Sequence, residues 1–294
     1  MKHEDEFLDF ICVAAPRSGT TWIAEALSQH PQIWIPGVKE LNFFNEKFLS
    51  HIEFKYPYGL TYYRKQFASA PAEAIIGELT PTYYVDPQAA TRIYKHFPAV
   101  KILIFLRNPA DVIFSTYLKL QEYGLFEKSL EEAISNMHEL LSLGYYYKFL
   151  KYYVELFPQE NIYISIYEDF FKNPTEGCES LFNFLSVDPS FRPSILTKRI
   201  NPRREVRWKS IVLFRHYLRL FINLKPLLPL KKIISCTGHL DRLSEKIIEL
   251  NLKDGEKKSL NTELRKRIME KFDSDILQLE NLFRLNLDVW RNKI

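Results

Sequence analysis

Four short apolar runs, each followed by a segment with helical periodicity, place the strongest constraint on the fold of this chain. The runs occupy residues 10–15, 74–79, 101–107 and 161–167. Strands that alternate with helices form parallel sheets, because a parallel pair needs a crossover connection. The run at 101–107 shows almost no polar alternation, which is typical of a strand covered on both faces. The pattern predicts an α/β, three-layer fold with a central parallel sheet flanked by helices.

The helical segments between these runs have recognisable starts. Pro109 and Pro174 suit the first turn of a helix, and Ser129 followed by Glu132 fits a capping box. The predicted helices cover residues 20–30, 87–97, 109–123, 129–143, 145–157 and 174–185. We expect a single domain over residues 1–294, with a basic helical insertion or lid at about 200–255.

Composition excludes several classes of protein. The chain is 46% hydrophobic, which is ordinary for a globular protein, and it has no apolar run of about 18 residues that would predict a membrane helix. Its first residues place acids before the apolar run and lack a signal-peptide layout. Cys12, Cys178 and Cys236 are odd in number and far apart, which favours a reducing compartment and a cytoplasmic location. We expect Cys12 to be a small buried residue of the first strand.

The sequence PRSGTTW, residues 16–22, lies where the first predicted strand turns into the first predicted helix. The start of a helix presents unpaired N–H groups and partial positive charge, so it binds anions. Gly19 allows a close approach of the backbone, Arg17 adds a cation, and Thr20 and Thr21 add hydroxyl donors. This combination predicts a phosphate-binding loop. The alternative is a strand–helix turn in which Gly and Thr serve only for capping.

The loop departs from the Walker A pattern, G-x-x-x-x-G-K-[ST], at two positions. Gly19 and Thr21 fit the pattern, but Ala14 replaces its first glycine and Thr20 replaces its lysine. That lysine reaches the terminal phosphates of ATP or GTP. The sequence therefore predicts a phosphate cradle in a P-loop-like fold without this lysine. A nucleotide-dependent kinase or a nucleotide-binding regulator is the alternative interpretation.

A second motif, FLRNPADVIFSTY at residues 105–117, ends a predicted strand in Arg107 and carries Ser115 eight residues later. Together the two motifs resemble those of the sulfotransferases that use 3′-phosphoadenosine 5′-phosphosulfate (PAPS). The resemblance covers most of residues 8–190 and extends weakly to the helical pattern at 259–283 and to Trp290. It implies a loop that wraps the 5′-phosphate and sulfonate of PAPS, a pair of residues that hold its 3′-phosphate, and no metal requirement. The implied cofactor-binding residues are Arg17, Ser18, Gly19, Thr20, Thr21 and Trp22 in the loop, and Arg107 and Ser115 for the 3′-phosphate.

The catalytic base is predicted from a third segment, IIGELTPTYYVDP at residues 75–87. It resembles the E-K-x-P-x-Y segment of the heparan-type glycan sulfotransferases, in which the glutamate is the base, and Glu78 is the matching residue. The lysine of that segment is Leu79 here, so its contact near the base is missing. Arg17 is the second predicted catalytic residue, because a cation there would stabilise the departing phosphate.

A rival base lies in GVKELNFFNE, residues 37–46, which resembles a segment of the acceptor cleft in glycan sulfotransferases. Lys39 and Glu40 are therefore predicted to bind the acceptor. Tyrosylprotein sulfotransferases place their catalytic glutamate in a comparable stretch, so Glu40 is the alternative to Glu78. The resemblance implies sulfonate transfer to a hydroxyl or amine, with a carbohydrate favoured over a small-molecule, lipid or tyrosyl acceptor.

A basic segment at residues 198–232 contains eleven Lys or Arg and one acid, so the rest of the chain carries a net charge of −6. Its apolar stripe fits a lid over the cofactor, an ordinary surface helix or a peripheral membrane contact. No recognised nucleic-acid motif accompanies it, so nucleic acid is not an expected partner. The seven histidines show no metal-ligand spacing, and no metal is predicted.

Overall fold

The computed structural model describes residues 7–46, 54–122, 128–197, 204–206, 252–254 and 259–291. These residues belong to two compact units. One unit draws on 1–113, 137–200 and 260–294, and the other on 114–136 and 201–259. In the second unit β6 (Arg204–Val206) pairs antiparallel with β7 (Leu252–Asp254). The rest of the predicted insertion and of the basic segment lies outside the described residues.

A five-stranded parallel sheet forms the centre of the first unit, in the order β2-β3-β1-β4-β5. Its strands are β1 (Phe10–Ala14), β2 (Ile33–Trp34), β3 (Ile75–Leu79), β4 (Lys101–Leu106) and β5 (Ile162–Ile166). The four predicted strands and the predicted α/β fold are confirmed. β2 was not predicted, because two residues are too few for a periodic pattern to show.

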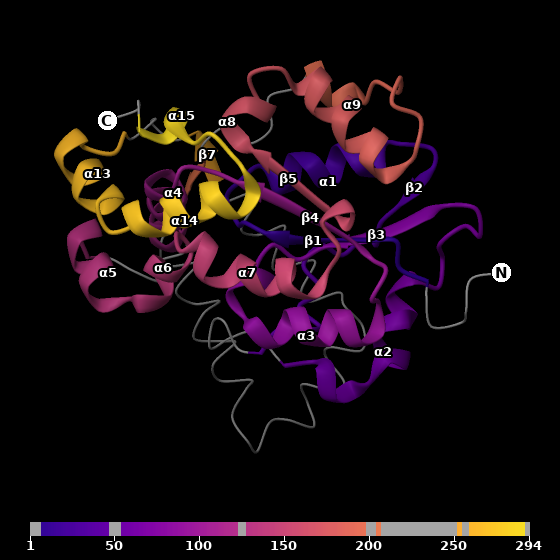
Figure 1. Cartoon of the computed structure of the whole chain (residues 1–294). Coiled ribbons are helices and arrows are strands. Elements are labelled where there is room, and N and C mark those ends of the chain that lie inside the picture. The colour runs from indigo at the N-terminus through magenta and orange to yellow at the C-terminus, as the bar shows by residue number, and fades with distance from the viewer. Residues whose placement is uncertain are drawn as a thin grey trace. The chain divides into compact units, whose positions relative to one another are not determined.

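Helices cover both faces of this sheet (Figure 1). In the figure α1 (Thr20–Ser28) and α9 (Pro174–Leu185) lie above it, and α3 (Pro87–His96) and α7 (Tyr146–Leu156) lie below. The upper layer shares an apolar core with the sheet, to which Phe10 and Phe105 contribute from the strands and Ile23 and Phe182 from the helices. Cys12 is fully buried in this core, as predicted. Burial on both faces explains the near-continuous apolar sequence of β4.

The remaining helices of the first unit are short or lie near the C-terminus. They are α2 (Leu60–Arg64), α6 (His138–Ser142), α8 (Tyr167–Phe170), α13 (Thr262–Met269), α14 (Asp273–Phe283) and α15 (Asp288–Arg291). α4 (Pro109–Glu122) begins in the first unit, and α5 (Leu130–Asn136) belongs to the second. No helix within the described ranges is long and apolar enough to cross a membrane.

Two predicted helices are broken in the structure, whereas the predicted capping box is present. The helix predicted over 129–143 ends at Asn136, because Met137 has φ −119° and ψ 87°, outside the helical region. The pattern at 259–283 forms α13 and α14 in place of one helix. Glu132 N donates to Ser129 Oγ over 3.2 Å, and Ser129 N donates to Glu132 Oε2 over 3.1 Å, as a capping box requires.

Candidate active site

The loop between β1 and α1 lies where the strand order reverses. β1 pairs with β3 on one side and with β4 on the other, so the sheet grows in opposite directions from it. Ligands of open parallel sheets bind outside the carboxyl ends of the strands at such a point. Ala15 N donates to the carbonyl of Phe105 over 2.7 Å, which ties the start of the loop to β4. The predicted phosphate loop therefore occupies the edge where this fold binds ligands.

Glycine is required at position 19 for two separate reasons. Gly19 has φ 78°, in the left-handed region that favours glycine. A Cβ at this position would lie 2.4 Å from the ring of Phe171, so a side chain has no room. The backbone of Gly19 caps the start of α1 without a side-chain cap. The first amide groups of α1 consequently stay available to an anion.

Lys39 brings a cation to the start of α1. Its Nζ donates to Thr21 Oγ1 over 3.0 Å and to Thr20 Oγ1 over 3.3 Å. Burial lowers the pKa of the Lys39 ammonium, Glu40 opposes this effect, and the charge of Arg17 adds to it. The structure thus places Lys39 beside the loop threonines and within electrostatic range of Arg17, a concentration of positive charge suited to an anionic group.

Arg107 reaches the same loop from the end of β4. Its Nη1 donates to the carbonyl of Arg17 over 3.0 Å, across 90 residues of sequence. The guanidinium carbon lies 4.5 Å from the ring centroid of Tyr167, which is a cation–π distance. Its buried Nε has no hydrogen-bond partner in the structure. Arg107 is therefore held at the loop by part of its donor set, and an unused donor remains for a ligand.

Glu78 lies at the end of β3 and is enclosed by hydroxyl groups. Tyr63 and Tyr83 donate to its Oε1 over 2.7 and 2.9 Å, and Thr80 donates to its Oε2 over 3.0 Å. Only 1% of the surface of Glu78 is exposed to solvent. Burial raises the pKa of the carboxyl, and the three hydroxyl groups partly offset that rise. The Glu78 carboxyl is therefore buried, and both of its oxygens accept hydrogen bonds from hydroxyl groups of the protein.

Glu40 has the opposite environment. Its side chain is 47% exposed, and its Oε1 lies 3.9 Å from Lys39 Nζ. The backbone is left-handed, with φ 61°, and Glu40 N donates to the carbonyl of Leu79 over 3.1 Å. This bond ties the segment of Lys39 and Glu40 to Leu79, the last residue of β3, which directly follows Glu78. The two candidate bases therefore sit on adjacent backbone segments, one enclosed and one accessible to an acceptor.

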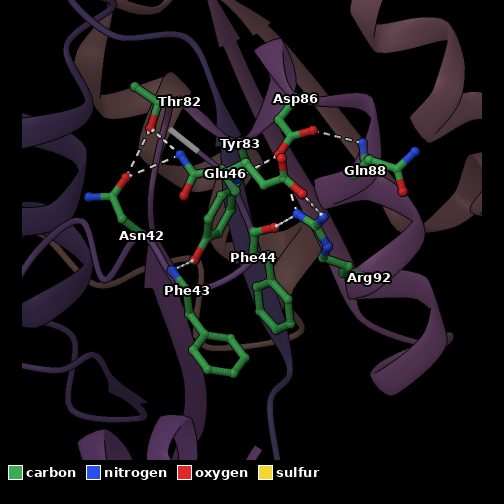
Figure 2. Close-up of polar contacts among 10 residues, drawn as sticks. Asn42, Phe43, Phe44, Glu46, Thr82, Tyr83, Asp86, Gln88 and Arg92 are labelled. Carbon is green, nitrogen blue, oxygen red and sulfur yellow. Dashed lines mark hydrogen bonds and ion pairs between the residues drawn. The ribbon is translucent and has the colours of Figure 1, made fainter. Parts of the chain in front are cut away.

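The segment that follows Glu40 is fixed to the connection between β3 and α3 (Figure 2). Phe43 N donates to the hydroxyl of Tyr83 over 3.0 Å. Arg92 Nη1 donates to the carbonyl of Phe44 over 2.7 Å, and its Nη2 pairs with Glu46 Oε1 at 2.6 Å. Since Tyr83 also binds Glu78, the carboxyl takes part in the network that holds this segment.

A pocket of about 280 Å³ opens between α1 and the segment that carries Lys39. Thr21, Glu25 and Ser28 line it from the helix, and Lys39 lines it from the opposite side. Thr21 lies in the predicted phosphate loop, and the Lys39 ammonium donates to its hydroxyl. The pocket therefore adjoins that loop.

Trp22, Ser18 and Ser115 are predicted to bind the cofactor, and their surroundings do not test these roles. Trp22 is 7% exposed, and its ring packs T-shaped on Phe170 and Phe171, so it belongs to the core. The Ser18 hydroxyl is buried without a hydrogen-bond partner in the structure. Ser115 lies on α4 in the second of the two units.

The family of the chain is shown by its similarity to known protein domains. The sulfotransferase domain family matches residues 8–202, which include the loop, both candidate bases and Arg107. The chain belongs to the sulfotransferase family. Membership supports the prediction that the protein is an enzyme of the transferase class, and PAPS as its co-substrate belongs to the function proposed below.

Several known sulfotransferases are similar to this one. Mouse heparan sulfate glucosamine 3-O-sulfotransferase 5 is 24% identical over 191 residues, covering 61% of this chain and 53% of its own length. A membrane-associated sulfotransferase of Dictyostelium discoideum is 31% identical over 132 residues, covering 43% of this chain and 27% of its own. The chain thus spans about half the length of the mouse enzyme and about a quarter of the length of the Dictyostelium enzyme. The crystal structure of a sulfotransferase from Alicyclobacillus acidocaldarius shares the fold, with a TM-score of 0.69 and 23% identity over 97% of this chain and 98% of that one.

The residues of the sulfotransferase loop fit a doubly phosphorylated nucleotide. The buried Ser18 hydroxyl and the Arg107 Nε are polar atoms without partners, which a ligand oxygen would satisfy. Gly19 closes the loop against Phe171 and leaves the start of α1 to an anion. Among the residues that the structure describes, no group of three or more His, Cys, Asp or Glu could hold a metal ion.

Sequence reasoning missed the residues that support this site. Tyr63 and Tyr83 hold Glu78, Tyr167 supports Arg107, and Phe171 fills the space beside Gly19. All four are aromatic residues in segments rich in such residues, where apolar packing is the default interpretation. Tyr83 occupies the tyrosine position of the E-K-x-P-x-Y segment, so that motif is a local signal for it. No local spacing distinguishes the other three, because each meets its partner only after the chain has folded.

Proposed function

We propose that this sulfotransferase moves a sulfonate group from PAPS to a hydroxyl, or an amine, of a carbohydrate. The observation that carries the proposal is the convergence of Lys39 and Arg107 on the loop that contains Arg17. Two cations from distant parts of the sequence meet at one helix start, which suits a donor with more than one anionic group. The named activity of the heparan sulfate relatives supports a carbohydrate acceptor.

The cationic and hydroxyl side chains at the loop have proposed roles. Arg17 and Lys39 stabilise the negative charge that grows on the phosphate side as the sulfonate leaves. Ser18, Thr20, Thr21 and the first amide groups of α1 bind the 5′-phosphosulfate. Arg107 selects the 3′-phosphate, and the role predicted for Ser115 rests on the sequence motif alone. PAPS itself supplies an activated sulfonate, and the protein positions the acceptor, removes its proton and stabilises the departing phosphate.

Glu78 is the proposed base. Its raised pKa brings a carboxyl closer to the basicity that proton abstraction from a hydroxyl requires. This role requires an acceptor hydroxyl to replace one of the three protein hydroxyl groups now bound to Glu78. Glu40 is the alternative base, since its exposed carboxylate beside Lys39 needs no such replacement. We place the acceptor beside Lys39 and Glu40, whose segment is bonded to the end of β3 one residue beyond Glu78.

A cytoplasmic location is part of the proposal. It is supported by Cys12 and Cys178, which are free and buried in the structure.

The proposed reaction is tested by a screen with radiolabelled PAPS over sugars, phenols, lipids and peptides. We expect label transfer to a carbohydrate without added magnesium, and loss of that transfer in Arg17→Ala. Transfer to tyrosyl peptides or phenols alone would overturn the carbohydrate acceptor and leave the sulfotransferase activity standing. Magnesium-dependent binding of ATP in preference to adenosine 3′,5′-bisphosphate would instead support a kinase-like function and overturn the proposal.

We predict that Arg107→Ala binds adenosine 3′,5′-bisphosphate at least tenfold more weakly and binds 5′-AMP nearly unchanged. Losing a charge-assisted contact costs about 1.5–3 kcal/mol, which corresponds to roughly ten- to hundredfold in affinity. Calorimetric titration of both nucleotides measures the difference. The control is Arg192→Ala, which removes an exposed arginine that pairs with Glu179 on the surface. Equal losses for the two nucleotides would contradict the role of Arg107.

A further inference from the structure

The last described helix, α15, is bonded directly to the residue that follows Arg107. Trp290 in α15 is fully buried, and its carbonyl accepts a hydrogen bond from Asn108 Nδ2 at 3.0 Å. Its indole Nε1 donates to Glu168 Oε2, also at 3.0 Å. These bonds cross 182 and 122 residues of sequence. The C-terminal helix therefore touches the end of β4, where the proposed 3′-phosphate arginine begins its side chain.

Glu168 carries the indole bond on to the backbone beside Arg107. Its second oxygen, Oε1, accepts a hydrogen bond from Asn108 N at 3.2 Å. Glu168 follows Tyr167 in α8, and the Tyr167 ring supports the Arg107 guanidinium at 4.5 Å. One short helix thus contacts Arg107 through the ring under its guanidinium, and it contacts the N–H of Asn108 through a carboxylate. The indole N–H fixes that carboxylate.

Tyr146 completes the contacts around this peptide. Its hydroxyl donates to the carbonyl of Arg107 over 2.7 Å, and its ring lies 5.9 Å from the Trp290 ring. The peptide group between Arg107 and Asn108 is consequently held through both its carbonyl and its N–H. A guanidinium that must meet a phosphate in a defined geometry benefits from a fixed backbone, because less freedom is lost on binding.

We propose that Trp290 is a positioning residue for Arg107 and sets the selectivity of the site for the 3′-phosphate through Glu168. The inference rests on the proposed function, in which Arg107 binds the 3′-phosphate of PAPS. It extends that function to Trp290 in α15, whose hydrogen bonds reach the backbone beside Arg107 through Asn108 and Glu168. The interaction couples docking of the C-terminal helix to nucleotide recognition.

Trp290→Phe tests the inference with little loss of packing. Phenylalanine keeps an apolar ring in the buried site and removes the indole N–H, whereas alanine would leave a large cavity. We expect the variant to bind adenosine 3′,5′-bisphosphate about three- to tenfold more weakly, the usual scale for a residue that acts through another. Its affinity for 5′-AMP should stay within about twofold of the wild-type value, because the 5′-phosphate site is untouched. Calorimetric titration gives both dissociation constants.

Arg291→Ala is the matched control on the same helix. Arg291 lies next to Trp290 and pairs with Glu280 at 2.6 Å, with its side chain 43% exposed. Its loss weakens the attachment of α15 to α14 and removes no bond to Asn108 or Glu168. We expect its ratio of the two dissociation constants to equal the wild-type ratio. A change as large as that of Trp290→Phe would overturn the inference, since general loosening of α15 would then explain both.

A double-mutant cycle separates positioning from a general structural effect. In an Arg107→Ala background, Trp290→Phe should cause no further change in the ratio of the two dissociation constants, because the group it positions is gone. Equal weakening of both nucleotides, or an undiminished effect in that background, would overturn the inference. If Trp290→Phe alone leaves the ratio unchanged, the inference fails and the proposed function stands. If Arg107→Ala also leaves it unchanged, the proposed role of Arg107 fails together with the inference.

Discussion

Arg17→Ala is expected to lower the turnover number of sulfonate transfer by about 10²–10³-fold, the scale of losing one charge-stabilising donor in an active site. Arg17 lies in the loop that Arg107 contacts, and its charge acts on Lys39. An interaction that is stronger in the transition state than in the ground state appears mainly in turnover. Affinity for adenosine 3′,5′-bisphosphate should therefore fall far less. Steady-state kinetics with saturating PAPS, together with calorimetry, measure both quantities.

The backbone of the loop limits which control is suitable for Arg17→Ala. Arg17 has φ 65°, a conformation that costs similar strain for any residue with a Cβ. Arg17→Lys keeps this strain and the positive charge and loses only the planar fork of donors. We expect it to retain much more turnover than Arg17→Ala. If Arg17→Ala turns over normally, Arg17 does not stabilise the departing phosphate.

Glu78→Gln is expected to lower sulfonate transfer by about 10²-fold or more, the usual scale for losing a general base. The amide fits the site: its oxygen keeps the bonds from Tyr63 and Tyr83, and its NH₂ group faces Thr80, whose hydroxyl can accept. Folding and nucleotide binding should therefore survive. Thermal unfolding and calorimetry check these two points, and initial rates with a carbohydrate acceptor check the loss.

The pH profile adds a second measurement of the same role. Burial raises the pKa of Glu78, and a base acts only when deprotonated. Activity should consequently fall as pH falls through that raised pKa, at a higher pH than an exposed glutamate would show. The profile of kcat/KM reports this group in the free enzyme.

Glu40→Gln is the matched comparison for Glu78→Gln. We expect a milder effect, mainly on the KM of the acceptor, because the exposed Glu40 is assigned to acceptor binding. The acid side of its pH profile should match that of the wild type. An inactive Glu40→Gln with an active Glu78→Gln would make Glu40 the base. Glu78 would then act on the acceptor segment through Tyr83 and Phe43, and the carbohydrate acceptor would lose its main support.

Some features of this sulfotransferase follow from local sequence because their physical cause is local. β4 is recognisable from a run of apolar residues, since burial on both faces needs no other information. The capping box of Ser129 and Glu132 forms within a single turn. Gly19 marks the phosphate loop because the turn requires a left-handed backbone. The apolar strand runs predicted the fold class, and the PRSGTTW and FLRNPADVIFSTY motifs predicted the family.

Contacts between distant segments decided the rest. Lys39 meets Thr20 and Thr21, and Arg107 meets Arg17, only because parallel strands bring their carboxyl ends to one edge of the sheet. The enclosure of Glu78 depends on Tyr63 as well as on Tyr83 of its own segment, and no periodicity encodes the contact with Tyr63.

Patterns a few residues long were enough to place candidate polar side chains at the ends of β1, β3 and β4. Tertiary structure alone decided which carboxyl is enclosed and which is open, and that Trp290 reaches Asn108 and Glu168. The physical reason is that burial and hydrogen-bond partners across more than a hundred residues depend on how the helices pack, and packing depends on the whole core.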